Sequence, residues 1–171
     1  MRDSDNRVGV TAAHWEPWRR EDLGAMAAIE EVIHADMRER PEVQQEKVAL
    51  FPRGCFCLHI GDGIAGYAVS HPWRLHESPP LDAFLKALPD PATCLYLHDV
   101  AILPTARGFR SAAALLEKLE ALARQEGLPA IALTSVYGTE DFWASFGFER
   151  SESHGADGSY GAGAVYMTRR V

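Results

Sequence analysis

Residues 94–112 read Cys-Leu-Tyr-Leu-His-Asp-Val-Ala-Ile-Leu-Pro-Thr-Ala-Arg-Gly-Phe-Arg-Ser-Ala, and this stretch decides the fold. Its first ten residues are the most apolar run of the chain, which indicates a central strand covered on both faces. Apolar positions then recur at helical spacing, which predicts an amphipathic helix over 111–126 with Gly127 as its C-terminal cap. A strand at 131–134 follows, and a strand-helix-strand connection of this kind requires a parallel pair of strands.

The remaining pattern predicts an α/β (α+β) fold, a mixed, mostly antiparallel central sheet flanked by helices. The other expected elements are a strand at 8–14, helices from Leu23 to Met37 and from Pro41 to Pro52, strands at 55–60 and 64–70, a short helix at 139–146, and final strands from Phe148 and at 164–168. Gly61-Asp-Gly is expected to join two strands as a hairpin, so the Gly-x-Gly-x-x-Gly pattern that ends at Gly66 is not taken as a dinucleotide site.

Two segments are expected to lie outside the sheet. Residues 72–93 contain five prolines around a short amphipathic piece at 81–88, which indicates a long excursion of the kind that often lines a binding site. Residues 154–163 contain four glycines and are expected to form a mobile loop.

Composition narrows the class of protein. A chain of 171 residues fits one domain, which we place at 1–171. The apolar runs are too short and too often broken by charge to cross a bilayer, and the polar N-terminus lacks the apolar core of a secretory signal. With three cysteines and no disulfide framework, the cytoplasm is the expected location, and a homodimer is left open. A net charge of -7 argues against nucleic acid as a partner, so an anionic ligand must meet a local positive site.

Arg107 and Arg110 form such a local positive site. They are the only charged residues between Leu103 and Leu116, and they stand in the turn that leads into the predicted helix. Exposed N–H groups at a helix start, the helix dipole and a glycine that allows close approach together suit a pyrophosphate. A solvated Arg-Gly turn is the alternative, but a helix start at the end of a central strand is where ligands bind in open α/β sheets.

The same residues carry a resemblance to a known family. From Leu95 to Phe148 the sequence resembles the GNAT superfamily of N-acetyltransferases, through the strand, the turn, the long helix and Phe-Trp-Ala-Ser-Phe-Gly-Phe at 142–148. The pyrophosphate loop of that family reads Gln/Arg-x-x-Gly-x-Gly/Ala. Arg107 and Ala112 match its ends, and Arg110 replaces its central glycine.

The resemblance implies acetyl-CoA as the co-substrate. Its pyrophosphate would lie on the loop, and its pantetheine arm would pair with the backbone of the central strand as an added strand. The residues that the resemblance implies in coenzyme binding are Ala101, Ile102, Leu103, Arg107, Gly108, Phe109, Arg110, Ser111, Ala112, Phe142 and Trp143.

Acetyl transfer to an amine needs an acceptor for the amine proton and a proton for the departing thiolate. His98 and Asp99 interrupt the central strand and are the candidate acceptors, with a satisfied buried polar residue as the alternative for each. Adjacent strand residues point to opposite faces, so at most one of them is expected to face the substrate. Many members of the family have a tyrosine acid where this chain has Trp143, whose indole is no acid. Tyr137 is the candidate substitute, although water can also protonate a thiolate.

His71 and Trp73, at the end of the second hairpin strand, are expected to contact the substrate, with a tryptophan that caps the core as the alternative. The histidines show no tight spacing with cysteines or carboxylates, so no metal is expected.

The expected function is acetyl-CoA-dependent N-acetylation of a primary amine on a small molecule or a protein. Arg110 and Trp143 depart from the family pattern, which keeps open an acyl-CoA-binding sensor or regulatory module with little or no activity. A second alternative is transfer to another nucleophile or from a longer acyl-CoA.

Overall fold

The computed structural model describes residues 12–151 and 156–171. Its longer elements, in chain order, are β1 (His14–Pro17), α1 (Leu23–Ile33), α2 (Pro41–Leu50), β2 (Cys55–Ile60), β3 (Gly63–Trp73), β4 (Cys94–Ile102), α3 (Phe109–Gln125), β5 (Ala130–Ser135), α4 (Glu140–Ala144), β6 (Glu149–Arg150) and β7 (Val165–Arg170). Short 3-10 helices are η1 (Arg20–Asp22), η2 (Pro52–Gly54), η3 (Pro104–Ala106) and η4 (Gly158–Tyr160).

The strands form one sheet in the order β1-β2-β3-β4-β5-β7-β6. β4 and β5 run parallel, and the other neighbouring pairs are antiparallel. The predicted fold class is confirmed, including the parallel pair around the long helix. The Gly61 turn joins β2 to β3 as the predicted hairpin, with φ +58° at the glycine.

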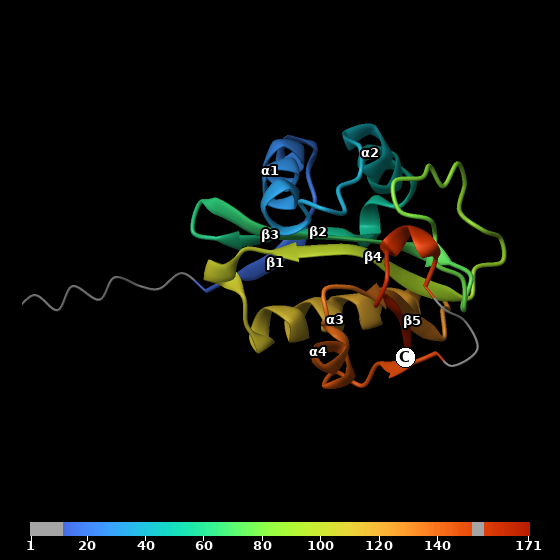
Figure 1. Cartoon of the computed structure of the whole chain (residues 1–171). Coiled ribbons are helices and arrows are strands. Elements are labelled where there is room, and N and C mark those ends of the chain that lie inside the picture. The colour runs from blue at the N-terminus through green and yellow to red at the C-terminus, as the bar shows by residue number, and fades with distance from the viewer. Residues whose placement is uncertain (1–11, 152–155) are drawn as a thin grey trace, which may run out of the picture.

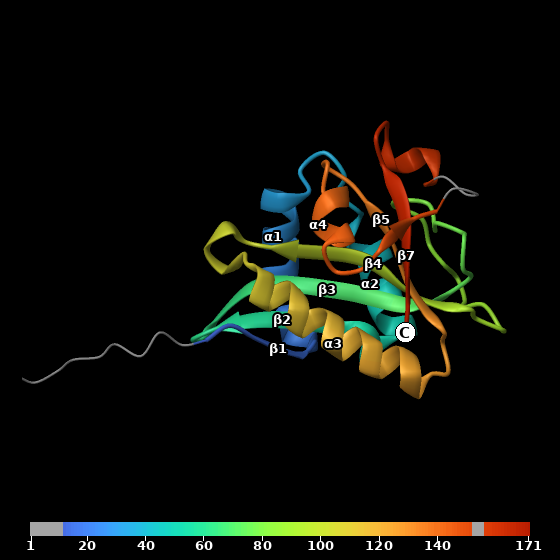
Figure 2. The same ribbon diagram turned by 90° about the horizontal axis from the view of Figure 1, so that it is seen from below.

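Helices cover both faces of the sheet. α1 and α2 lie on one face, and α3 and α4 lie on the other (Figure 1). Figure 2 shows α3 running across the strands on its face. α3 begins at Phe109 rather than at residue 111, and Gly127 follows it at φ +68°, the left-handed conformation that favours glycine after a helix.

The largest hydrophobic cluster lies between α3 and the sheet. Leu115 and Leu119 pack there with Leu95 of β4, as the predicted helix face requires. At the edge of the sheet, the Trp15 indole of β1 donates a 2.8 Å hydrogen bond to the carbonyl oxygen of Ser111, in the first turn of α3. The sheet therefore holds the N-terminus of α3 in a fixed place.

β4 carries one extra residue opposite β3. Val69 pairs with Asp99, but Ser70 pairs with Leu97, so His98 has no partner residue on β3. This arrangement is a β-bulge, which inserts one residue into one strand of an antiparallel pair.

The bulge changes which side chains face which layer of helices. Leu97, before the bulge, and Val100, after it, both pack against the α3 cluster, because the added residue shifts the alternation by one position. His98 and Asp99 therefore both point to the face that α1 and α2 cover. The expectation that at most one of them would face the site is wrong for this reason.

β4 and β5 pair only from Leu95 to Leu97 on β4. Beyond that point β4 continues beside β3 to Ile102, whereas β5 continues beside β7 to Ser135. The two parallel strands therefore part at their C-terminal ends, next to the start of α3.

Two predicted boundaries near the N-terminus are wrong. The strand expected at 8–14 is β1 at His14–Pro17, where Trp15 is buried and pairs with β2; residues 8–11 lie outside the described residues. α1 ends at Ile33 instead of Met37, because the backbone of His34 leaves the helical conformation and its ring turns toward β4.

β3 runs to Trp73, beyond the predicted end at residue 70. Pro72 lies within it and pairs with Leu95. The Trp73 carbonyl accepts the N–H of Thr93 on the β4 side, so the Pro72 nitrogen faces the opposite side. On that side β2 does not reach Pro72, because Cys55, the first residue of β2, pairs with Val69. A proline without an N–H is tolerated at such an open edge.

Residues 74–93 form the predicted excursion, but the piece at 81–88 is not helical and takes positive φ at Asp82 and Lys86. The predicted loop at 154–163 lies partly outside the described residues. Its described part contains η4, where Tyr160 is buried and its hydroxyl donates a 2.9 Å hydrogen bond to the Pro79 carbonyl. The two segments therefore pack against each other.

Gly54, at the end of η2, offers a test of the packing of β3. A Cβ at this position would clash with the backbone carbonyl oxygen of Ser70. We expect Gly54→Ala to lower the free energy of unfolding by about 1–3 kcal/mol, the usual cost of overpacking, as measured by urea denaturation. Gly24→Ala in α1 is the matched control, because a Cβ there meets no atom within 4 Å. Equal stability of the two variants would contradict the packing.

Candidate functional site

A cavity of about 570 Å³ occupies the region where β4 and β5 part. It extends from the N-terminus of α3 to the C-terminal end of α1, and residues of α4 and η4 complete its wall. Most of the wall is apolar. Its polar and charged residues are His34, Glu39, His98, Asp99, Arg107, Thr134, Tyr137, Thr139 and Tyr160.

Arg107 and Gly108 form one end of the cavity. The Nε of Arg107 donates a 3.0 Å hydrogen bond to the Ile102 carbonyl at the end of β4. In the described part of the chain, no side chain caps the N-terminus of α3, which leaves the N–H groups of its first turn to other acceptors. An arginine beside an uncapped helix N-terminus suits an anion.

The other loop residues have different positions. Ala112 lines the cavity, whereas the Arg110 side chain is exposed and does not line it. The Ser111 hydroxyl donates a 3.1 Å hydrogen bond to the Ala106 carbonyl and so holds the turn. Phe109 begins α3, and its side chain lies outside what the structure describes.

The last residues of β4 present their backbone to the cavity. Ile102 lines it, while Ala101 and Leu103 pack toward α1. The carbonyl groups of Val100 and Ile102 accept hydrogen bonds from cavity-lining side chains, and the N–H of Leu103 bonds to β3. Because the N–H and C=O of one strand residue point the same way, the backbone groups of Val100 and Ile102 face away from β3.

His34 and Asp99 meet on the other side of the cavity. The Nε2 of His34 lies 3.0 Å from Asp99 Oδ1 and 3.3 Å from the carbonyl oxygen of Val100. The Tyr67 hydroxyl donates a 2.6 Å hydrogen bond to Asp99 Oδ2. Burial alone would lower the pKa of His34, but the hydrogen bond and negative charge of Asp99 outweigh burial, and the pKa is raised.

Tyr137 lies over the His34 ring, with the ring centroids 5.8 Å apart and the planes nearly parallel. Its side chain is half exposed, in the connection between β5 and α4. Partial burial, with the charges of Asp36 and Asp99, raises the pKa of Tyr137. The phenol therefore keeps its proton at neutral pH.

Glu39 belongs to a chain of buried polar groups beside the cavity. Its Oε1 accepts a 2.8 Å hydrogen bond from Lys47 Nζ and lies 3.2 Å from His98 Nε2. His98 Nδ1 lies 3.2 Å from His71 Nε2, and His71 Nδ1 lies 3.1 Å from the Pro72 carbonyl. The Lys47 and His98 side chains have 0% and 1% of their surface exposed.

These contacts determine where the protons are. Carbonyl and carboxylate oxygens only accept, so His71 Nδ1 and His98 Nε2 carry hydrogens. Burial and the neighbouring His98 lower the pKa of His71 to about 3, so His71 is neutral and its Nε2 accepts from His98 Nδ1. Both ring nitrogens of His98 are therefore engaged by neighbouring side chains. Burial opposes the charge of Glu39, but His98 and Lys47 lower its pKa to about 2.

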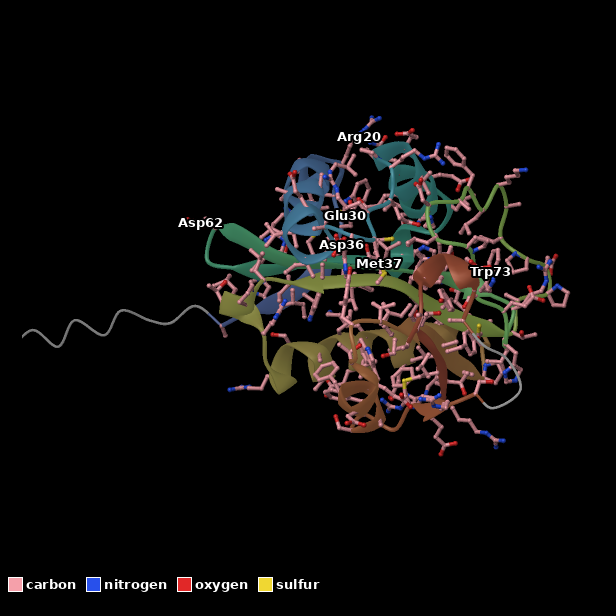
Figure 3. All side chains as sticks on the ribbon, in the orientation of Figure 1. Arg20, Glu30, Asp36, Met37, Asp62 and Trp73 are labelled. Atoms are coloured by element: carbon pink, nitrogen blue, oxygen red, sulfur yellow. The ribbon has the colours of Figure 1, made fainter. Side chains whose placement is uncertain are left out.

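The structure does not bring His71 and Trp73 to the cavity wall. His71 is fully buried, and its Nε2 contacts His98. Trp73 lies toward the far end of the sheet from Asp36 and Met37, which lie between α1 and β4 (Figure 3). The reason is that β3 continues past its predicted end and carries both side chains beyond the site.

Phe142 and Trp143, which the resemblance implies in coenzyme binding, line the cavity from α4. Trp143 is buried and packs edge-on against Phe148, with centroids 5.7 Å apart. Phe142 remains 40% exposed. Together they add an aromatic wall near the start of α3.

Sequence reasoning missed His34, Glu39 and Lys47. His34 lies within the stretch that was predicted to continue as helix, so periodicity concealed it. Lys47 did carry a signal, because it lies four residues after Val43 on the buried side of the predicted helix, where a charge needs a partner. Glu39 lies in a connection that has no pattern.

Within residues 12–151 and 156–171, no group of three or more His, Cys, Asp or Glu side chains is arranged to hold a metal ion. Over the same residues, no helix combines the length and the apolar character that crossing a bilayer requires.

The model of the acetyltransferase (GNAT) family matches residues 10–148. The chain belongs to the GNAT family of acetyltransferases. It is therefore an acyltransferase of the N-acetyltransferase class, whose members use an acyl-CoA as co-substrate. A search of curated proteins finds no significant match.

Solved structures share this GNAT fold. The loading GNATL domain of CurA from Lyngbya majuscula aligns with a TM-score of 0.77 and 15% identity, over 92% of this chain and 97% of that one. Ard1 from Thermoplasma volcanium aligns with a TM-score of 0.70 and 14% identity, over 94% of this chain and 98% of that one. The ribosomal-protein-S18-alanine N-acetyltransferase from Escherichia coli aligns with a TM-score of 0.66 and 16% identity, over 93% of this chain and 94% of that one. At these identities the likeness concerns the fold.

Glu39→Gln tests the buried charges. A carboxyl whose pKa falls from 4.5 to about 2 on folding contributes about 3 kcal/mol of stability above its unfolded pKa, and that contribution is lost as the pH falls toward the folded pKa. We expect the variant to be less stable by about 3 kcal/mol at neutral pH, because Lys47 and His98 lose their charged partner. Its stability should also fall less than that of the wild type between about pH 5 and pH 3.

Urea denaturation across this pH range measures both effects. Glu42→Gln, on the exposed side of α2, is the matched control and should follow the wild type. Parallel curves for Glu39→Gln and the wild type would contradict the assigned charges.

Proposed function

We propose that this GNAT acyltransferase transfers the acetyl group of acetyl-CoA to a primary amine, carried by a small molecule or by the N-terminus or a lysine of a protein. One observation carries the proposal: a single cavity joins the N-terminus of α3 to His34, Asp99 and Tyr137. One molecule could therefore place its pyrophosphate at the helix and its acyl group beside the polar residues.

The pyrophosphate end is supported by charge and by backbone geometry. Arg107 lies at this end of the cavity, and the first-turn N–H groups of α3 add the positive end of a helix dipole. In a chain of net charge -7, such a local positive site is needed to attract a coenzyme rich in phosphate. Arg110 adds positive charge to the same turn from the solvent side.

The acyl end would lie along β4. Val100 and Ile102 turn their backbone groups away from β3. Their carbonyls already accept from His34 and Arg107, and their N–H groups face the side where a pantetheine arm could pair with them. One of these N–H groups would also stabilise the oxyanion that forms when an amine attacks the thioester.

Protons would move on the α1 side of the cavity. Asp99 and Tyr137 both line this part of the cavity, which supports Asp99 as a neighbour of the acceptor amine and Tyr137, which keeps its proton at neutral pH, as the acid for the thiolate of CoA. Trp143 occupies the position of the usual tyrosine and offers only an aromatic surface. His98 holds Glu39 and His71, and we give it no direct part in the transfer.

An acyl-CoA-binding module without turnover is the second candidate, favoured by Arg110 and Trp143 at two positions where the family pattern differs. Release of CoA separates the candidates. We would follow it with a thiol reagent for an arylalkylamine, a polyamine, free amino acids, a peptide that begins with alanine and a peptide with an internal lysine. Turnover of at least one amine, with the acetylated product seen by mass spectrometry, supports the enzyme; tight binding of acetyl-CoA without turnover supports the module.

Competition among acetyl-, propionyl- and butyryl-CoA would measure acyl preference, which the first experiment leaves open.

The same proposal places one domain, residues 1–171, in the cytoplasm, alone or as a homodimer.

Arg107→Ala should weaken the binding of CoA about 10- to 100-fold, since a charge-assisted hydrogen bond contributes about 1.5–3 kcal/mol. Arg110→Ala should act in the same direction. Calorimetry with CoA measures both, and Arg124→Ala, at the opposite end of α3, is the matched control that should bind as the wild type does. Unchanged affinity in both loop variants would rule out the pyrophosphate assignment.

A further inference from the structure

The two ring nitrogens of His34 differ in their contacts within the described part of the chain. Its Nε2 lies 3.0 Å from Asp99 Oδ1 and 3.3 Å from the carbonyl oxygen of Val100. Both oxygens are acceptors, so Nε2 carries the hydrogen in the neutral ring and the lone pair is on Nδ1. Across residues 12–151 and 156–171, no group hydrogen-bonds to that Nδ1.

The His34 ring lies where an acyl group would react. It lines the cavity, yet only 12% of the side-chain surface is exposed, so it is reachable and largely shielded from water. Its contact with Val100 is two residues before Ile102, whose carbonyl receives Arg107, a separation of roughly 7 Å along the strand. The ring is therefore displaced along β4 from the loop at the pyrophosphate end, beside the backbone that is open to the cavity.

The two acceptors predicted from the sequence are already engaged. The Asp99 oxygens accept from His34 and from the Tyr67 hydroxyl, and the two ring nitrogens of His98 contact His71 Nε2 and Glu39 Oε1. A carboxylate bonded to one nitrogen of an imidazole fixes the tautomer and stabilises the imidazolium that forms when the other nitrogen takes a proton. Asp99 is such a carboxylate for His34, because its Oδ1 lies beside His34 Nε2 and leaves Nδ1 to take the proton.

We infer that His34 is the base that takes the proton of the acceptor amine and that Asp99 is its positioning residue, an inference that rests on the proposed acetyl transfer. The acceptor ammonium passes a proton to His34 Nδ1, which releases it to water, and the freed amine lone pair attacks the thioester carbon. A C–N bond forms, and the C–S bond breaks as the CoA thiolate takes a proton from Tyr137 or from water. The second proton that the nitrogen loses replaces the one that the thiolate took, so the products are the amide, the free thiol and one proton in water.

Titratable groups face His34 from each neighbouring element. Asp99 of β4, Glu30 of α1 and Tyr137 after β5 act on or contact the ring itself. Tyr67 of β3 bonds to Asp99, and the charge of Asp36 acts on Tyr137. Burial opposes the imidazolium, but Asp99 and Glu30 favour it and raise the pKa of His34. Because the base must be neutral, turnover should rise with pH through this raised pKa.

Two acceptors test the inference with His34→Gln, Asp99→Asn and the control His14→Gln, an exposed residue of β1. The most active alkylamine of the panel arrives protonated, whereas hydroxylamine is largely neutral at pH 7. For the alkylamine, we expect His34→Gln to lower kcat about 100-fold or more and to remove the rise with pH, the usual effect of losing a general base. The loss should be under about tenfold for hydroxylamine, which requires less proton removal. Asp99→Asn should lower kcat for the alkylamine, and the control should match the wild type.

Nitrogen-15 NMR of the histidine rings gives a readout that does not depend on turnover. We expect the Nε2–H tautomer for neutral His34, with a pKa that falls in Asp99→Asn. An Nδ1–H tautomer, equal losses for the two acceptors, or an unchanged pH rise in His34→Gln would overturn the role of His34 while acetyl transfer itself stands. If acetyl-CoA binds but the wild type acetylates no acceptor, the proposed function fails and the base fails with it.

Discussion

The site depends on a short strand pairing: β4 and β5 share only the residues from Leu95 to Leu97 before they part. Each strand keeps its other neighbour, β3 or β7, so the sheet remains intact while one edge of each strand turns toward a cavity of about 570 Å³. Backbone groups left without partners away from water cost free energy. A ligand that adds amide groups along β4 removes that cost, so the parted strands favour a ligand with a peptide-like arm.

The bulge at His98 brings β4 into contact with the connection between α1 and α2. His98 reaches Glu39, and Asp99 reaches His34, so two adjacent residues of one strand hold two residues of one irregular segment. Glu39 also accepts the N–H of Asp82 at 3.0 Å, from the excursion that follows β3. Buried ions contribute little net stability but are costly when a partner is removed. These charges therefore hold segments without regular secondary structure in one arrangement.

The local hydrophobic pattern of the sequence was enough to predict the helices and strands that bury one regular face. The strand at 94–102, the hairpin and α3 were predicted within two or three residues, because their periodicity is set by the residues themselves. The wrong boundaries have another cause, which is contact between residues far apart in the sequence. α1 ends at the point where His34 contacts the carbonyl of Val100, 66 positions away. β3 continues through Pro72 because β2 does not extend beside that residue. The α3 turn was visible in the sequence because its arginine, glycine and helix start are neighbours. The polar end of the cavity was visible only in part: Asp99, His98 and Tyr137 were named from the sequence, but His34 and Glu39 meet β4 only through contacts between residues far apart in the chain.

The two ends of the cavity present opposite charge, and this creates a conflict at the acceptor end. Asp36 and Asp99 lie near Tyr137 and favour a cation, which is the form in which most alkylamines reach the enzyme. The same negative charges stabilise the ammonium and make its proton harder to remove. A carboxylate is a weak base near neutral pH, whereas an imidazole whose pKa is raised by Asp99 is a stronger one. The charges that attract the acceptor thus also strengthen the base that must deprotonate it.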